Sequence, residues 1–223
     1  MREEARATES RAAGFADFDN DGDLDLYFVQ ANELSCATDQ QPPTGNKLFL
    51  QTAPLKFVDA TEQSGLGDLG HGMGVACADF DGDGDVDVYL CNFGKDALYR
   101  NNGDGTFTNI TIEAGIGVEG ISISAGWIDF DQDSDLDLYI TQYIEFNPET
   151  VCNDAAGRAE FCGPKAFPAS LDVFLENNGD GTFRDISKEV GIRESAAASL
   201  GVAGLIAAVL GWRHGGACSR WVE

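Results

Sequence analysis

The chain contains the nine-residue string Asp17-Phe-Asp19-Asn-Asp21-Gly-Asp23-Leu-Asp25, in which every second residue is an aspartate. Two further strings repeat this pattern: Asp79-Phe-Asp81-Gly-Asp83-Gly-Asp85-Val-Asp87 and Asp129-Phe-Asp131-Gln-Asp133-Ser-Asp135-Leu-Asp137. We call them loop 1 (17–25), loop 2 (79–87) and loop 3 (129–137). Five carboxylates in nine residues repel one another unless a cation lies among them. Calcium suits such a loop, because it takes roughly 6–8 oxygen ligands at about 2.3–2.6 Å. The strings therefore predict about three structural Ca²⁺ ions.

Short apolar runs flank each loop and repeat along the chain. Around loop 2 they are Gly74-Val-Ala-Cys-Ala78, Val88-Tyr-Leu-Cys91, Ala97-Leu-Tyr-Arg100 and Phe107-Thr-Asn-Ile-Thr111. Such runs are typical of β-strands. The last two are joined by Asn101-Asn-Gly-Asp-Gly-Thr-Phe107, whose residues tolerate the positive φ of a tight hairpin. Each unit therefore reads as four antiparallel strands, and tandem four-stranded units are typical of a β-propeller.

The predicted fold is all-β, with about three antiparallel blades of an incomplete propeller. We expect a disordered leader over residues 1–12 and blades at about 13–62, 72–115 and 122–192, with an atypical tail over 193–223. The first unit carries an insertion from Gln30 to about Gly45, and the third a longer one from Tyr143 to about Ser170.

Both ends of the chain depart from the repeat. Residues 1–11 are polar and charged and have no apolar core of signal-peptide type, so we expect a fragment whose export signal lies upstream, rather than a misassigned start or a cytoplasmic protein. Residues 195–212 are uncharged and contain no fourth aspartate loop. Three interpretations stay open for this tail: a frameshifted or truncated fourth blade, a buried or fraying piece of that blade, or a membrane anchor.

The motif D-x-D-x-D-G-x-x-D between two short strands, followed by N-N-G-D-G-T-F, resembles the FG-GAP/VCBS repeats of the integrin α-subunit propeller. The arrangement over about residues 13–192 is most similar to proteins related to cartilage acidic protein. Propellers of that family usually have about seven blades, and three are complete here. The resemblance implies that positions 1, 3, 5 and 9 of each loop bind Ca²⁺ through side-chain oxygens and position 7 through its backbone carbonyl. The implied ligands are Asp17, Asp19, Asp21, Asp25 and the Asp23 carbonyl; Asp79, Asp81, Asp83, Asp87 and the Asp85 carbonyl; and Asp129, Asp131, Asp133, Asp137 and the Asp135 carbonyl.

Loop 3 differs from the other two at position 6, where glycine allows a sharp turn without a steric penalty. Gly22 and Gly84 occupy this position, whereas loop 3 has Ser134. We therefore expect a weaker or strained third site. An EF-hand is excluded, because its twelfth residue is a glutamate between two helices. Here the twelfth residue is Phe28, Leu90 or Ile140, each within a strand-like run.

Six cysteines occur without any C-x-x-C pair, which gives a zinc site little support. A disulfide between Cys152 and Cys162 is predicted to close the third unit's insertion. Cys77 and Cys91 could pair with each other or with Cys36, or remain free thiols. An even cysteine count in an acidic, calcium-rich chain fits an oxidising compartment. We therefore expect an extracellular, cell-surface or periplasmic location.

Two aromatic positions repeat with the loops and are expected to fill the core between blades. They are Phe18, Phe80 and Phe130 within the loops, and Tyr27, Tyr89 and Tyr139 just after them. The N-N-G-D-G turns are interpreted as hairpins, not phosphate-binding loops. Of the two histidines, His71 is assigned to a surface loop, and no Ser-His-Asp set or H-E-x-x-H motif accompanies His71 or His214.

The net charge of -24 makes nucleic acid and anionic membrane surfaces unsuitable partners. We expect a calcium-binding module, not an enzyme, that serves adhesion or binds a protein or carbohydrate ligand without inserting into a membrane. Open blade edges could also support self-association. Two alternatives are a catalytic propeller module acting on polysaccharide and a low-affinity acidic calcium buffer.

Overall fold

The computed structural model describes residues 10–32 and 44–194, and nearly all of their regular structure is antiparallel β-sheet. Twelve strands form three four-stranded units, which we call blades 1, 2 and 3. Blade 1 contains β1 (Ser10–Ala16), β2 (Asp25–Gln30), β3 (Lys47–Ala53) and β4 (Lys56–Asp59), followed by the short helix α1 (Thr61–Ser64). Blade 2 contains β5 (His71–Ala78), β6 (Asp87–Lys95), β7 (Ala97–Asn101) and β8 (Phe107–Asn109). Blade 3 contains β9 (Glu119–Ile128), β10 (Asp137–Gln142), β13 (Val173–Asn177) and β14 (Phe183–Asp185).

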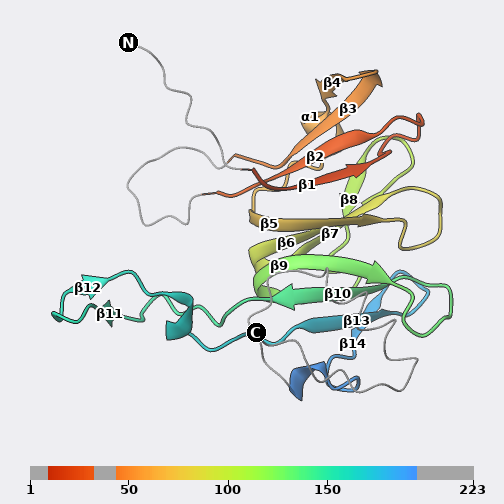
Figure 1. Ribbon diagram of the computed structural model, residues 1–223. Helices are drawn as coiled ribbons and strands as arrows, with labels where there is room; N and C mark the ends of the chain where they lie inside the picture. Colours follow the sequence, from red (N-terminus) through yellow and green to blue (C-terminus); the bar gives the residue numbers. More distant parts are fainter. Residues whose placement is uncertain (1–9, 33–43, 195–223) are drawn as a thin grey trace, which may run out of the picture.

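Strands pair with their neighbours in chain order inside each blade, and each aspartate loop joins the first strand to the second. The first strands, β1, β5 and β9, lie side by side across the stack (Figure 1). Blades 2 and 3 also share hydrogen bonds, because the end of β6 pairs with the start of β9 from Phe93–Ile121 to Lys95–Glu119. The structure confirms the predicted all-β fold of incomplete propeller blades.

Some sequence predictions fall outside the described residues. These include residues 1–9 of the expected leader, residues 33–43 of the first insertion, residues 195–223 of the tail, and Cys36, His214 and Cys218. Strand β1 starts at Ser10, so residues 10–12 belong to blade 1 and not to the leader. Ala12 packs partly buried against the core between blades 1 and 2. Every helix within residues 10–32 and 44–194 falls short of the length and apolar character of a transmembrane span.

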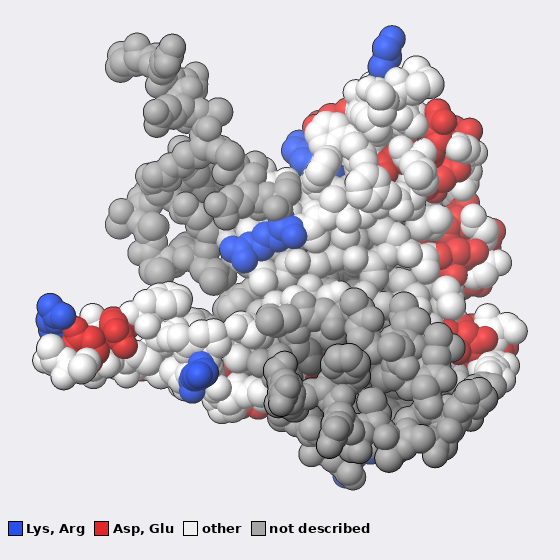
Figure 2. Space-filling view, in the orientation of Figure 1, with Lys and Arg blue, Asp and Glu red and all other residues white. Residues whose placement is uncertain are grey.

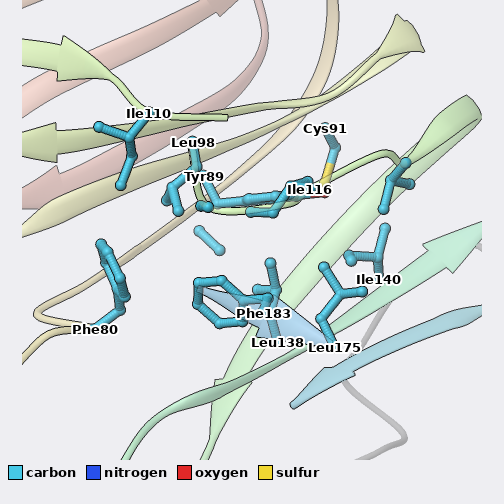
Figure 3. Close-up of a cluster of buried hydrophobic side chains, with 13 residues drawn as sticks. Phe80, Tyr89, Cys91, Leu98, Ile110, Ile116, Leu138, Ile140, Leu175 and Phe183 are labelled. Carbon is cyan, nitrogen blue, oxygen red and sulfur yellow. The ribbon is translucent and has the colours of Figure 1, made fainter. Parts of the chain in front are cut away.

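The core lies between the blades, and the loop phenylalanines are part of it. Phe18 is 1 % exposed and meets Phe107 of blade 2 edge-on, with ring centroids 6.1 Å apart. Phe80 is 2 % exposed, stacks on Trp127 and contacts Phe183 of blade 3. Figure 3 shows Phe80 and Phe183 within this buried cluster. The core role predicted for Phe18 and Phe80 is therefore confirmed.

Phe130, at the same position of loop 3, has a different environment. It is 37 % exposed and packs edge-on against Phe174 of its own blade, with centroids 5.0 Å apart. Among the described residues there is no fourth blade to cover it. The three equivalent phenylalanines therefore differ in burial because only the first two lie between blades.

The repeated tyrosines are buried as predicted, and each hydroxyl donates a hydrogen bond. Tyr27 donates to the Leu66 carbonyl at 2.8 Å. Tyr89 and Tyr139 donate to the carboxylates of Asp96 and Asp172 at 2.8 and 2.7 Å. The polar tip of each ring is thus satisfied inside the core, as burial requires.

Close approach of neighbouring blades explains a glycine in β5. A Cβ atom added to Gly74 would lie 2.4 Å from the Ile123 carbonyl oxygen of β9. Backbone on both sides leaves no flexible group to move away. The inner strands of blades 2 and 3 can therefore pack this closely only with glycine at this position.

The third unit's insertion forms an arm that projects away from the blades on the side opposite the aspartate loops (Figure 1). It contains β11 (Cys152–Asn153), β12 (Ala159–Glu160) and the 3-10 helix η1 (Pro164–Ala166). A second 3-10 helix, η2 (Ile192–Glu194), follows blade 3. The predicted Cys152–Cys162 disulfide is present and closes the arm. Cys77 and Cys91 are free thiols on opposite faces of blade 2, since Cys77 packs toward blade 1 and Cys91 toward blade 3, so they do not pair with each other.

Candidate metal centres

The three aspartate loops lie along one edge of the stack, where Figure 2 shows three groups of acidic side chains. This placement follows from the topology. Each loop connects the end of a blade's first strand to the start of its second, and the first strands run in the same direction (Figure 1). The repeat therefore brings fifteen aspartates to a single edge.

In loops 1 and 2 the chain curls around the first carboxylate. Asp17 accepts hydrogen bonds from the backbone N–H groups of Asp21 at 3.1 Å and Gly22 at 2.9 Å. Asp79 accepts the equivalent pair from Asp83 and Gly84 at the same distances. In loop 3 the N–H of Gln132 donates to Asp129 at 2.6 Å. These bonds hold the first carboxylate inside the turn and point the following side chains toward it.

The last aspartate of each loop is buried and fixes both ends of the loop. Asp87 accepts hydrogen bonds from the Phe80 N–H at 3.1 Å and the Asn101 N–H at 2.8 Å. Asp25 does the same with Phe18 and Gln51, and Asp137 with Phe130 and Asn177. Position 9 therefore ties its loop to the end of the blade's third strand, a structural role that the ligand prediction did not include.

The structure brings some of the predicted ligands together and leaves others apart. Carboxylate oxygens lie within 4.8 Å of one another in three groups: Asp17, Asp19 and Asp25; Asp79, Asp81 and Asp87; and Asp129, Asp131 and Asp133. Oxygens bound to a single Ca²⁺ lie at most about 4.6–5.2 Å apart, twice the metal–oxygen distance. All three donor sets therefore fit this ion in chemistry and in spacing.

The remaining aspartates lie outside these groups. Asp21 and Asp83 at position 5 accept hydrogen bonds from the N–H groups two residues later. Asp137 does not join the group of loop 3, whose three residues are all exposed. The side chains of Asp23, Asp85 and Asp135 join no group. Loop 3 is thus the most open of the three.

Burial and mutual repulsion disfavour the ionised form of several aspartates in these loops. Burial raises the pKa of Asp87 to about 7, and two backbone hydrogen bonds only partly offset it. The pKa values of Asp19 and Asp81 are also raised, first by burial and then by a neighbouring aspartate. A cation among the carboxylates would remove this penalty, because an opposite charge favours the ionised form.

Positions 4 and 6 of every loop have left-handed backbone conformations. Loop 2 has glycine at both, with φ of 74° and 96°, and loop 1 has Asn20 at 60° and Gly22 at 91°. Loop 3 has Gln132 at 69° and Ser134 at 82°. The expected positive φ at Ser134 is confirmed. A side chain in this region costs roughly 1–2 kcal/mol, so loop 3 carries the most backbone strain.

Sequence reasoning missed two asparagines that link neighbouring blades. Asn101 and Asn177 open the predicted hairpin turns, which do form. Their side-chain amides also donate to the preceding loop, Asn101 to the Phe18 carbonyl at 3.1 Å and Asn177 to the Phe80 carbonyl at 3.0 Å. Both side chains are buried. Blade 1 has Gln51 at the equivalent position. An asparagine that recurs in blades 2 and 3 but not in blade 1 is the sequence signal that could have identified this link.

Asp96 is a second residue that the sequence did not single out. Its carboxylate is 3 % exposed and accepts hydrogen bonds from the Tyr89 hydroxyl, the Asn92 N–H and the Ser122 hydroxyl. Ser122 belongs to β9 and in turn accepts from Gln142 at 2.7 Å. This buried network connects blades 2 and 3, and Asn46 occupies the equivalent position in blade 1, where its side chain accepts from the Gln30 N–H.

Stability is expected to fall as the pH rises through the titration range of Asp96. Burial raises the pKa of Asp96 from its ordinary 3.8 to about 7 in the folded protein. The folded chain therefore holds an extra proton between these values, so the stability that Asp96 contributes is fully present below about pH 4 and is lost as the pH rises through 7. The effect is on the order of a few kcal/mol. Asp96→Asn should remove this slope, which denaturant unfolding at pH 5.5 and 8 in saturating calcium would measure. Equal slopes in both proteins would contradict the assignment.

The comparisons with known proteins agree with this geometry. A profile of the FG-GAP-like repeat family matches residues 17–90 and 79–140, which include loops 1, 2 and 3 and blade 2. No curated protein matches the chain significantly. Since the matched residues span more than half of the chain, the protein belongs to the FG-GAP-like repeat family and is a propeller-type repeat module.

Proposed function

We propose that this chain is a calcium-binding propeller module that presents its surface to a protein or carbohydrate ligand. The proposal rests chiefly on one observation: each of the three loops brings three carboxylates within 4.8 Å of one another, from positions 1, 3 and 9 in loops 1 and 2 and from positions 1, 3 and 5 in loop 3. A solvated acidic surface does not require such a cluster to recur at every loop. Calcium at these sites would be structural, because the blades must fold before the ligands come together.

The disulfide in the arm supports an oxidising compartment, and we propose an extracellular, cell-surface or periplasmic location. The arm is also the proposed ligand-contact surface. Phe161 is 94 % exposed and Val151 is 75 % exposed, which puts apolar side chains in water on a segment that the disulfide constrains. Phe161→Ser should weaken capture of a ligand by the intact chain, and unchanged capture would argue against this role for the arm.

Self-association is a second proposal for partners. The outer face of blade 1 includes Phe15, which is 64 % exposed, and a Phe28–Phe49 contact. Blade 2 uses the equivalent face, with Val88, Leu90 and Tyr99, to pack against blade 1. A blade from a second copy would therefore fit it, and sedimentation equilibrium would detect this as a concentration-dependent mass. A constant monomer mass would contradict it.

A catalytic role is not part of the proposal. His71, the only histidine among the described residues, lies beside the Asn32 carbonyl and the Phe93 ring, with no carboxylate among these contacts. A turnover screen on acidic polysaccharides would test the enzyme alternative. Detectable turnover by the purified chain would require revision.

The loop assignment is tested by removing two ligands from one loop. Asp79→Asn combined with Asp81→Asn should lower the calcium stoichiometry by about one, because both oxygens belong to the group of loop 2. Glu113→Gln combined with Glu119→Gln is the matched control, since it removes the same charge from exposed sites near blade 2. Calorimetric titration would measure both, and the control should retain every site. Equal losses in the two variants would favour the acidic-buffer alternative and contradict specific loop sites.

A further inference from the structure

A hydrogen bond joins loop 1 directly to loop 2. The side-chain amide of Asn20, at position 4 of loop 1, donates to Oδ1 of Asp85, at position 7 of loop 2, at 2.5 Å. The backbone N–H of Asp85 donates in turn to Asp83 at 2.9 Å. Asn20 lies between Asp19 and Asp21. The contact therefore connects the ligand-bearing backbone of one loop to that of the next.

A second, buried connection runs parallel to the first. Asn101 donates its side-chain amide to the Phe18 carbonyl of loop 1 and its backbone N–H to the carboxylate of Asp87 in loop 2. Phe18 separates Asp17 from Asp19, and Asp87 belongs to the carboxylate group of loop 2. Two independent paths therefore link the first two loops.

Loops 2 and 3 share only one of these connections. Asn177 repeats the buried link, since it donates to the Phe80 carbonyl and to Asp137. The direct link is not repeated, because Gly82 occupies the position of Asn20 and has no side chain. The described structure thus joins loops 1 and 2 more tightly than loops 2 and 3.

We propose that Asn20 couples the first two loops, so that Ca²⁺ in one raises the affinity of the other. The inference rests on the proposed calcium-binding function. A cation fixes the backbone around Asn20, and the hydrogen bond then restricts Asp85 and its neighbours before the second cation arrives. Binding of the second ion then costs less conformational entropy, and this difference is a source of positive cooperativity.

Electrostatics opposes this coupling. An ion in loop 1 lowers the negative potential that attracts an ion to loop 2. At about 0.15 M salt the Debye length is roughly 8 Å, so this repulsive contribution is reduced but not removed. Asn20 is neutral, so replacing it changes the hydrogen-bond path and leaves the charge of both loops unaltered. A comparison of variants at position 20 therefore isolates the hydrogen bond.

The test uses the full chain with loop 3 disabled by Asp129→Asn and Asp131→Asn, so that two sites remain. In this background Asn20→Gly removes the side chain and leaves the positive φ that glycine adopts freely. Gln132→Gly is the matched control, at the same position of loop 3 and with a similar φ. Calorimetric titration gives the ratio of the second to the first stepwise binding constant. This ratio should fall at least about fivefold in Asn20→Gly, the lower end of usual coupling strengths, and stay unchanged in Gln132→Gly.

Each other outcome contradicts a separate statement. Two sites that fill independently in the background protein would overturn the coupling and leave the proposed function intact. Cooperative filling that persists in Asn20→Gly would overturn the role of Asn20. Absence of saturable binding in both the background and the unaltered chain would overturn the proposed function and the coupling together.

Discussion

Chelation of calcium is expected to lower the melting temperature of this protein on the order of 20 °C. A ligand at about 100 times its Kd stabilises the folded state by about 2.7 kcal/mol per site, and three such sites give about 8 kcal/mol. Domains of this kind are usually stable by only about 5–15 kcal/mol. One kcal/mol shifts the melting temperature of a chain of 150–250 residues by roughly 2–4 °C. Thermal unfolding followed by circular dichroism, with and without EDTA, would measure the change.

The same experiment has an internal control. Returning excess Ca²⁺ after chelation should restore the original melting temperature, because the loss arises from an empty site and not from damage to the chain. Mg²⁺ should restore less, since it prefers near-ideal octahedral geometry and gives up its water reluctantly. A melting temperature that ignores both EDTA and Ca²⁺ would contradict structural calcium in these loops.

Phe80→Ala is expected to destabilise the protein by about 3–5 kcal/mol. Phe80 lies in loop 2 and reaches across the interface, where it contacts Trp127 and Phe183 of blade 3. Truncation would leave a cavity between the two packed blades. The midpoint of denaturant unfolding in saturating calcium would give this cost.

Phe130→Ala is the matched variant, because Phe130 has the same position in loop 3 and is 37 % exposed. Phe130→Ala should lower the free energy of unfolding by less than about half as much as Phe80→Ala, because it removes less apolar surface from a packed environment. Equal costs at the two positions would show that the loop phenylalanines act within their own blades. That result would contradict the account of an interblade core.

The sequence was sufficient to predict the blades, because two periodic signals coincide in it. The alternating aspartates mark each first turn, and the N-N-G-D-G-T-F string marks the last hairpin of blades 2 and 3. Local chemistry determines both features. The start of β1 at Ser10 was not predicted, because residues 10–12 are small or polar and their pairing with β2 is a tertiary contact.

Much of the candidate site could also be predicted, since ligand spacing is a local property. The contacts between the site and the neighbouring blades could not be predicted. The burial of Asp87, the bridges from Asn101 and Asn177, and the network around Asp96 depend on which blade packs against which loop. The difference between Phe80 and Phe130 has the same origin, because identical positions in the repeat meet different neighbours.

The central claim is that the three loops are matched calcium sites that hold the blades together. Calorimetric titration of EDTA-treated protein with Ca²⁺, with melting curves recorded at each stage, tests it most directly. We predict saturation at about three ions per chain, with loop 3 the weakest site and a melting temperature that rises as the sites fill. Numerous weak sites that salt abolishes, with no change in melting, would contradict the claim.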